Sequence, residues 1–375
     1  MQGRELLTIT MYGHVEEDSE MAAMLECCTC PKPIESCMEA LTKSYESDPP
    51  ELNPPVNKPR NATCGIDLGA LAGTKLPHSR RTACYCSSEE VKLLYEIFFP
   101  VQFGLPVMTR PEGKPLLQHK LYLLLLTVSH GVGAYPDEGS DATCMAGVSL
   151  LSALADIRES LKTDISAAFV GDPACRSYSE VIRCYPGFAA MLAYRCAHVL
   201  YKAGAALYAR ELAELAHCST GVDIHPGATI GNYCFIDHAT GTVIGETAVL
   251  GEWCRLYQSV TIGALHFAHD PTTGALQKGY KRHPTIGNNV VIGSGAKLLG
   301  PIVVGDDVSI GANCWIQEDV PSNTSVVIKD HPQQLLKHRP PSTRPGAASS
   351  SRSPSCSPSL QCSDESRTPS PKEQQ

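Results

Sequence analysis

The sequence has few aromatic and few charged residues: 6% of its 375 residues are Phe, Trp or Tyr and 19% are charged, while glycine (30) and proline (28) are plentiful. Basic residues are not in excess, because 31 Lys and Arg stand against 39 Asp and Glu, for a net charge of −8. A nucleic-acid-binding protein would need a basic surface, so this balance argues against one. No apolar run approaches the ~20 residues that span a bilayer, and we expect no membrane partner.

The first twenty residues have no features of a signal or transit peptide, because they carry several acidic side chains. These are Glu5, Glu16, Glu17, Asp18 and Glu20. Without a secretory leader, and with an odd count of 17 cysteines, we interpret the protein as cytoplasmic and its thiols as reduced, many of them small buried residues. Cys27-x-x-Cys30 has the spacing of a zinc-ligand pair, but no second pair completes it, so we expect no metal.

Composition divides the chain into four segments. Residues 1–86 mix Cys, Pro and Glu without periodicity, and we expect a partly disordered extension. Residues 87–220 are expected to form a helical domain, residues 221–330 a repeat domain, and the Ser- and Pro-rich residues 331–375 a disordered tail. In the second segment, five apolar residues are spaced four, three, four and four positions apart, which predicts one buried face of a helix. Its members are Leu150, Leu154, Ile157, Leu161 and Ile165.

Residues 223–328 show neither helical nor strand periodicity, because aliphatic residues recur every six positions in three registers. The thirteen positions are Ile224, Ile230, Ile236, Ile244, Leu250, Leu256, Ile262, Ile286, Ile292, Leu298, Val304, Ile310 and Ile316. Glycine follows many of them, which suits tight corners. A repeat of this period predicts a parallel β-helix in which three units form one triangular coil with the aliphatic side chains stacked inside.

The six-residue register is interrupted in two places, and interruptions of a regular repeat are where functional residues tend to lie. Eight residues separate Ile236 from Ile244, and this stretch contains His238. The second interruption is a loop over 264–282, which we expect to leave the coil. It ends at Arg282, next to His283.

Asp223 and His238 lie fifteen residues apart, close to the length of one coil. They could therefore stack on adjacent coils, where the carboxylate would orient the imidazole as a general base for a hydroxyl or amine. Arg282 offers a planar guanidinium that fits a substrate carboxylate. Taken singly, each of these side chains could equally be a solvated loop residue.

Several longer motifs stand in and before the coil. They are Asp223-Ile224-His225-Pro226, Asp237-His238-Ala239-Thr240-Gly241, Val243-Ile244-Gly245-Glu246-Thr247-Ala248, Gln258-Ser259-Val260-Thr261-Ile262-Gly263 and Arg282-His283-Pro284, with Asp172-Pro173-Ala174 and Pro186-Gly187-Phe188 in the helical segment. Taken together, these motifs resemble serine O-acetyltransferase, a hexapeptide-repeat acyltransferase of cysteine biosynthesis. The resemblance covers roughly residues 150–328. It implies an α+β fold, with an N-terminal all-helical domain followed by a left-handed β-helix.

The resemblance also implies roles for individual residues. His238 would take the proton of the L-serine hydroxyl as it attacks acetyl-CoA, and Asp223 would orient His238. Asp172 and Asp237 would bind the ammonium group of serine, and Arg282 and His283 its carboxylate. Small residues would line the site of acetyl-CoA, the co-substrate, in a groove between neighbouring subunits. These are Gly263, Ala264, Ser294, Gly295, Ser309 and Ala312.

The same resemblance implies partners. L-cysteine is expected to be a feedback inhibitor, and the subunits a homotrimer or, through the helical domain, a hexamer formed by two trimers. Many relatives end in an isoleucine that inserts into O-acetylserine sulfhydrylase. This chain ends at Gln375, so a complex with that enzyme is not expected by this contact.

Three other kinds of protein use the same coil. A γ-type carbonic anhydrase needs three zinc-binding histidines, and no triple here has that spacing. A hexapeptide acetyltransferase for another hydroxyl or amine acceptor, or a non-catalytic β-helix used in assembly, stays an alternative from sequence alone.

Overall fold

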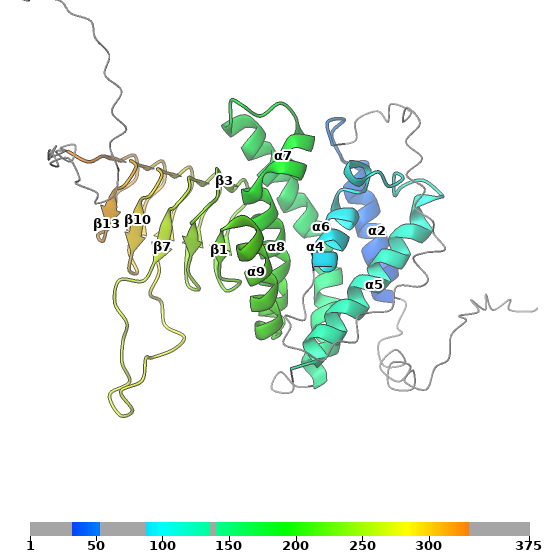
Figure 1. Cartoon of the computed structure of the whole chain (residues 1–375), viewed down its shortest axis with the longest axis horizontal. Helices are drawn as coiled ribbons and strands as arrows, with labels where there is room; N and C mark the ends of the chain where they lie inside the picture. The colour runs from blue at the N-terminus through cyan, green and yellow to red at the C-terminus, as the bar shows by residue number, and fades with distance from the viewer. Residues whose placement is uncertain (1–31, 53–87, 136–139, 330–375) are drawn as a thin grey trace, which may run out of the picture. The chain divides into compact units, whose positions relative to one another are not determined.

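The computed structural model describes residues 32–52, 88–135 and 140–329. Helices come first and short parallel strands follow (Figure 1), which confirms the predicted order of a helical region and a hexapeptide-repeat β-helix. The predicted disorder of 331–375, and of most of 1–86, lies outside the described residues, as do Cys27 and Cys30. None of the helices in the described ranges has the length and apolarity needed to cross a membrane.

The helical region consists of seven α-helices and one 3-10 helix within the described residues. They are α2 (Lys32–Glu46), α4 (Ser88–Phe98), η1 (Pro100–Phe103), α5 (Gly113–Gly133), α6 (Ser140–Gly171), α7 (Tyr178–Cys184), α8 (Pro186–Lys202) and α9 (Ala206–Thr220). The apolar face predicted from Leu150 to Ile165 lies on α6 and is buried along its length, so that prediction is confirmed. Proline sets the start of α8, because its fixed φ suits the first helical turn.

Helix α2 lies inside the segment for which the sequence analysis predicted only an extension. Its buried side chains Ile34, Cys37, Leu41 and Tyr45 are spaced three, four and four residues apart, which is helical spacing. They join the same apolar core as α6. The packed helical region therefore includes residues before 87, and the short periodic stretch was obscured by the prolines and cysteines around it.

The strands are two or three residues long and form three parallel sheets. The strands are β1 (Asp223–Ile224), β2 (Thr229–Ile230), β3 (Phe235–Ile236), β4 (Val243–Ile244), β5 (Val249–Leu250), β6 (Arg255–Leu256), β7 (Thr261–Gly263), β8 (Thr285–Ile286), β9 (Val291–Ile292), β10 (Lys297–Leu299), β11 (Val303–Val304), β12 (Ser309–Ile310), β13 (Trp315–Ile316) and β14 (Ser325–Val326). Sheet A has the order β1-β4-β7-β10-β13, sheet B β11-β8-β5-β2, and sheet C β14-β12-β9-β6-β3.

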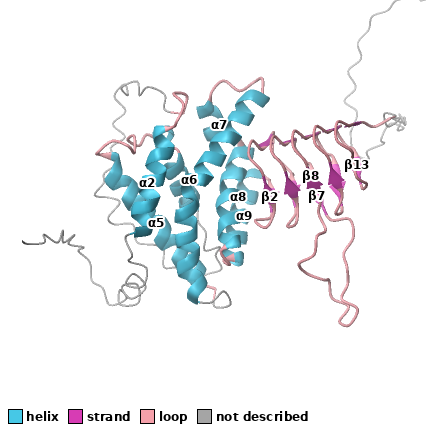
Figure 2. Cartoon of the chain, turned by 180° about the vertical axis from the view of Figure 1, so that it is seen from behind, coloured by secondary structure: helices cyan, strands magenta, loops and turns pink. Residues whose placement is uncertain are grey.

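The strand register confirms that three six-residue units make one coil. Ile244 pairs with Ile262, eighteen residues further along, whereas Ile224 pairs with Ile244 across twenty residues because of the two-residue insertion. The thirteen aliphatic residues of the period are buried in one core. The segment 264–284 leaves the coil between β7 and β8 (Figure 2). Cys234, Cys254 and Cys314 are buried free thiols in the coil, as predicted for small packed residues.

Helix α8 joins the two regions, because it is buried on both sides. Phe188 and Leu192 belong to the helical core, while Met191 and Tyr194 belong to the core of the coil. The first coil would otherwise expose unpaired backbone groups at its end. Tyr194 donates from its hydroxyl to the carbonyl of Ala228 (2.8 Å) and accepts from the N–H of Ile230 (3.1 Å).

Candidate active site

Each coil turns at three corners, and most of the predicted site residues lie on or beside two of them. We call the turns from sheet C to sheet A the CA corner, and those from sheet A to sheet B the AB corner. The CA corner comprises residues 237–242, 257–260, 293–296 and 311–314, and the AB corner comprises 225–228, 245–248, 264–284 and 300–302.

The first break in the repeat places His238 on the CA corner in an unusual backbone conformation. His238 and Ala239 have φ angles of 59° and 61°, in the left-handed region that residues with a Cβ enter at a cost. This pair accommodates the two extra residues of the turn. The His238 side chain is 69% exposed, so its ring nitrogens can reach a substrate. Such exposure suits a general base.

Two carboxylates lie near His238. Asp237 is buried, and its Oδ1 is 3.8 Å from Nδ1 of His238. Asp172 follows the end of α6, where the Tyr185 hydroxyl donates to Oδ2 (2.5 Å) and the Ala174 N–H donates to Oδ1 (2.8 Å). The hydrogen bond from Tyr185, then that from Ala174, hold the pKa of Asp172 below its usual value, and the charge of His238 contributes in the same direction.

Asp223 begins β1, where its backbone N–H donates to the carbonyl of Thr242 (2.9 Å). Among the described residues, no hydrogen bond or ion pair joins Asp223 to His238, and the carboxylate within 4.0 Å of the imidazole is that of Asp237. The orienting role of Asp223 therefore stays a prediction.

Arg282 lies on the AB corner and is held there by an ion pair. Its Nη2 is 2.5 Å from Oε2 of Glu246, and the Tyr201 hydroxyl of α8 donates to the other oxygen (3.2 Å). Burial acts to raise the pKa of Glu246, but the hydrogen bond and charge of Arg282 outweigh it, so the pKa is lowered. Glu246 is therefore ionised at neutral pH.

His283 is buried beside Arg282. Burial, followed by the charge of Arg282, lowers the pKa of His283 to about 4. Nδ1 accepts from the backbone N–H of Thr247 (3.0 Å), so the neutral ring carries its proton on Nε2. A side chain at Gly245 would collide with this ring, because its Cβ would lie 2.2 Å from Nε2. Nε2 is the nitrogen left to donate to a ligand.

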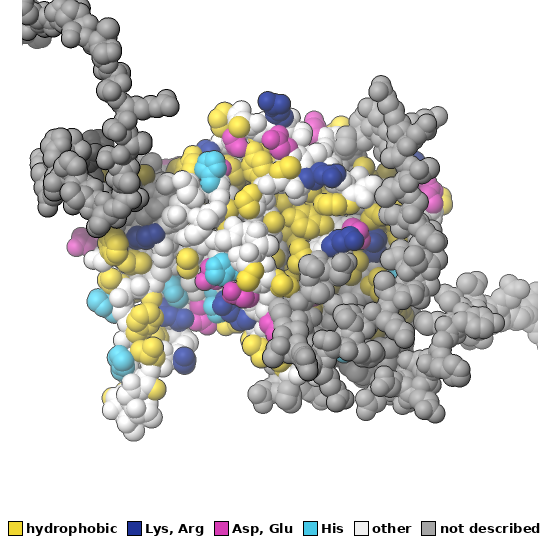
Figure 3. Space-filling model, in the orientation of Figure 1, with side chains coloured by type: hydrophobic (Ala, Val, Ile, Leu, Met, Phe, Trp, Pro, Cys, Tyr) yellow, Lys and Arg dark blue, Asp and Glu magenta, His cyan; other side chains and the backbone are white. Residues whose placement is uncertain are grey.

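Figure 3 shows histidine, acidic and basic side chains gathered on the coil near the base of the long loop. Sequence reasoning missed the residues that hold the predicted groups in place: Tyr185 for Asp172, and Tyr201, Glu246 and Thr247 for the AB corner. Glu246 and Thr247 lie within one of the motifs that resemble serine O-acetyltransferase, and that motif could have indicated them. The two tyrosines reach the site only through helix packing.

The residues predicted to line the acetyl-CoA site divide between the same two corners. Ser294, Gly295 and Ala312 continue the CA corner beyond His238, whereas Gly263 and Ala264 lie at the end of β7 and the start of the AB corner. Ser309 is exposed on the outer face of sheet C. Ser294, Gly295 and Ala312 have small side chains or none and stand on the same corner as the exposed imidazole, which is compatible with a thioester there. Their contact with acetyl-CoA stays a prediction.

Among the residues that the structure describes, no group of three or more His, Cys, Asp or Glu side chains is arranged to hold a metal ion.

Known proteins that are similar in sequence contain the same six-residue repeat. Residues 283–317 match the family described as bacterial transferase hexapeptide (six repeats). Together with the six-residue coil, this match defines the chain as a hexapeptide-repeat transferase. The chain is 48% identical over 182 residues to a serine acetyltransferase of Mycobacterium tuberculosis, a match that spans 48% of this chain and 74% of the relative. The chain belongs to the serine acetyltransferase family.

Other relatives extend this likeness. A plasmid-encoded serine acetyltransferase of Synechococcus elongatus is 52% identical over 174 residues, which span 46% of this chain and only 54% of that protein. The crystal structure of serine acetyltransferase 1 from Entamoeba histolytica in complex with L-cysteine matches with a TM-score of 0.65 and 41% identity, covering 79% of this chain and 98% of that one. Isoform 3 of the same organism, also solved with cysteine, matches with a TM-score of 0.64 and 38% identity over 82% of this chain and 96% of that one.

Proposed function

We propose that this protein is a serine O-acetyltransferase, which transfers the acetyl group of acetyl-CoA to the hydroxyl of L-serine and releases O-acetyl-L-serine and CoA. The observation that carries the proposal is the exposed imidazole of His238, held at the break of the coil beside Asp237 and Asp172. A serine hydroxyl is a weak nucleophile and needs an adjacent base. Family membership supplies the substrate class.

In the proposed reaction, His238 accepts the hydroxyl proton as the serine oxygen bonds to the acetyl carbon. The carbon–sulfur bond then breaks, and the imidazolium returns its proton to the departing CoA sulfur. Asp223 orients His238. The oxyanion that forms between these two steps needs N–H donors, which backbone groups of the coil would supply.

Serine carries two opposite charges, and the proposed ligands for them lie on different corners. Asp172 and Asp237 would bind the ammonium group at the CA corner, while Arg282 and His283 would bind the carboxylate at the AB corner. Because a strand of sheet A separates the two corners in each coil, we infer that the CA corner of one copy meets the AB corner of the next. A closed ring of three copies satisfies this requirement. The acetyl-CoA residues divide between the corners in the same way, which supports the homotrimer.

Several further features belong to the same proposal. The coil is left-handed, the helical region pairs two trimers, and the repeat domain over 221–330 and the tail over 331–375 have the boundaries predicted from sequence. L-cysteine competes at the serine site, supported by the two Entamoeba histolytica enzymes solved with cysteine. The reaction takes place in the cytoplasm, which the eight free cysteines of the described residues support.

The first experiment measures CoA release from acetyl-CoA with L-serine, other amino acids and sugars as acceptors. We expect L-serine to be preferred. His238→Ala should lower kcat by about 10² to 10⁴, while His217→Ala, which removes an exposed histidine on α9, should be without effect. Equal rates with sugars would refute the acceptor, and an active His238→Ala protein would refute the base.

A complementation experiment tests the shared site. His238→Ala and Arg282→Ala should each be inactive alone. When equal amounts of the two proteins are unfolded and refolded together, one of the three sites in each mixed trimer, and about a quarter of all sites, would have both corners intact. Activity should therefore return to roughly that fraction. A mixture that assembles into trimers but stays inactive would show that each site lies within one copy.

A further inference from the structure

Arg255 occupies an unusual position on the outer face of sheet C. The outward residues at the equivalent positions of the neighbouring strands are Phe235, Val291, Ser309 and Ser325. The guanidinium is held between two aromatic rings, with its Cζ 5.2 Å from the centre of Phe235 and 5.0 Å from that of Tyr257. Only 26% of the side chain is exposed. An arginine this enclosed needs acidic partners to offset its desolvation.

Those partners are the two carboxylates of the candidate ammonium site. Nη2 of Arg255 is 3.5 Å from Oδ2 of Asp237, while the other oxygen of Asp237 faces His238. Arg255 also contributes to the low pKa of Asp172, after the hydrogen bonds from Tyr185 and Ala174. Asp237 thus lies between a cation on one side and the imidazole on the other.

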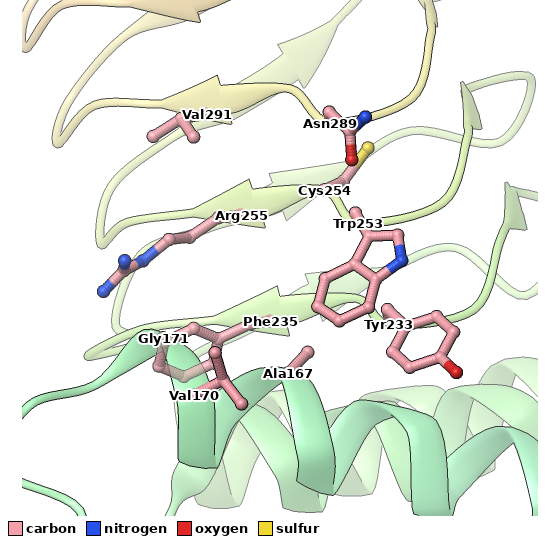
Figure 4. Close-up of a pocket in the computed structure, with 10 residues that line it drawn as sticks. All are labelled: Ala167, Val170, Gly171, Tyr233, Phe235, Trp253, Cys254, Arg255, Asn289 and Val291. Carbon is pink, nitrogen blue, oxygen red and sulfur yellow. The ribbon is translucent and has the colours of Figure 1, made fainter. Parts of the chain in front are cut away.

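A pocket of about 270 Å³ adjoins this arrangement, between the end of α6 and sheet C (Figure 4). The guanidinium of Arg255 extends along its edge toward Gly171 and Phe235, and the stacked rings of Trp253 and Tyr233 form the opposite side. A Cβ built on Gly171 would lie 3.7 Å from Cζ of Arg255. The end of α6 therefore closes over the guanidinium and limits its movement away from the two carboxylates.

The charges can be counted from these contacts. Asp172 and Asp237 bring two negative charges, and Arg255 offsets one of them. The site is left with one surplus negative charge, which matches an acceptor that carries one ammonium group.

Resting on the proposed function, we propose that Arg255 is a positioning residue for the acceptor's ammonium group: it fixes the carboxylate of Asp237 from the side opposite His238. It acts through Asp237 and does not touch the acceptor or acetyl-CoA. The contact of Asp237 with the ammonium group is then made by a carboxylate already in place, which strengthens binding of L-serine without taking part in proton transfer.

The test compares Arg255→Met, which keeps a long side chain between the rings, with Arg255→Lys, which also keeps the charge. Arg183→Met is the matched control, because Arg183 also lies over an aromatic ring, 5.8 Å from the centre of Phe103, but bonds a backbone carbonyl. For each protein, KM and kcat are measured with L-serine at saturating acetyl-CoA. Inhibition by 3-hydroxypropionate, which is L-serine without the ammonium group, is measured in parallel.

Arg255→Met should raise KM for L-serine about tenfold, the effect of one charge-assisted contact, and change kcat less than threefold. The inhibition constant of 3-hydroxypropionate should stay within twofold, because that acid has no ammonium group for Asp237 to bind. Arg255→Lys should recover most of the affinity, and Arg183→Met should match the unmodified protein.

An unchanged KM for L-serine in Arg255→Met would overturn the inference. So would an equal loss of affinity for 3-hydroxypropionate, because that result would mean that Arg255 only supports the local fold. The proposed function fails by a different result, namely an unmodified protein that does not acetylate L-serine at all.

Discussion

Gly187, the second residue of α8, packs directly against the backbone that leads to His238. A Cβ at this position would lie 1.9 Å from the carbonyl oxygen of Ile236, whereas Cβ atoms essentially never approach other heavy atoms closer than 3.0 Å. Gly187→Ala must therefore move the helix or the strand by at least the difference between 1.9 and 3.0 Å, which is 1.1 Å. Ile236 directly precedes Asp237 and His238, so the displacement reaches the proposed base.

Two effects of this change can be estimated separately. Overpacking of this kind costs about 1–3 kcal/mol of unfolding free energy. A shift of about 1 Å in a catalytic group lowers the rate by roughly 10²-fold. We expect Gly187→Ala to remain folded at 25 °C and to lose about two orders of magnitude in kcat. Urea unfolding gives the stability, and CoA release per folded subunit gives kcat.

Gly204, which lies two residues beyond the C-terminal end of α8, provides the matched control. Its φ is 93°, and a Cβ there would meet nothing within 4 Å. Gly204→Ala should therefore lose about 1–2 kcal/mol through backbone strain but keep its kcat. Full activity in Gly187→Ala would refute the argument that α8 positions the CA corner. An equal loss of kcat in both variants would show that the loss comes from lower stability and not from the position of the CA corner.

Three further predictions concern groups that support the site. Asp164→Asn should lower the free energy of unfolding by about 3–5 kcal/mol, because it leaves the buried Arg195 without its carboxylate partner. Urea unfolding measures this loss. The double variant Asp164→Leu, Arg195→Met should recover much of it. Tyr185→Phe should raise KM for L-serine several-fold, since Asp172 loses its 2.5 Å hydrogen bond; an unchanged KM would contradict this role. Because the pKa of His283 in the folded protein, about 4, is below the 6.5 usual for histidine, the unfolded chain binds the extra proton, and stability should fall as pH drops from about 6.5 to 4. This part of the pH dependence should be absent from His283→Gln when thermal unfolding is compared across that range.

The coil could be predicted from sequence because its period is local. Each six-residue unit contributes one inward aliphatic side chain, and the corner between units needs small or flexible residues, so thirteen positions carry the signal. The paired motifs Asp237-His238 and Arg282-His283 were visible for a related reason, since each pair stands at a break in the same period. Helix α2 was missed because its fifteen residues are bounded by segments rich in proline and cysteine, and only packing against α6 reveals its apolar face.

Distances across the site depend on contacts between residues far apart in the chain. The period suggested Asp223 as the partner of His238, but the carboxylate that lies within 4.0 Å is that of Asp237. Tyr185 reaches Asp172 because α6 and α7 pack together, and Arg255 reaches Asp237 because β6 pairs with β3 on the next coil. Which corner each residue occupies follows from the closure of the coil into three sheets, which places Asp237 and His238 on one corner and Arg282 and His283 on another.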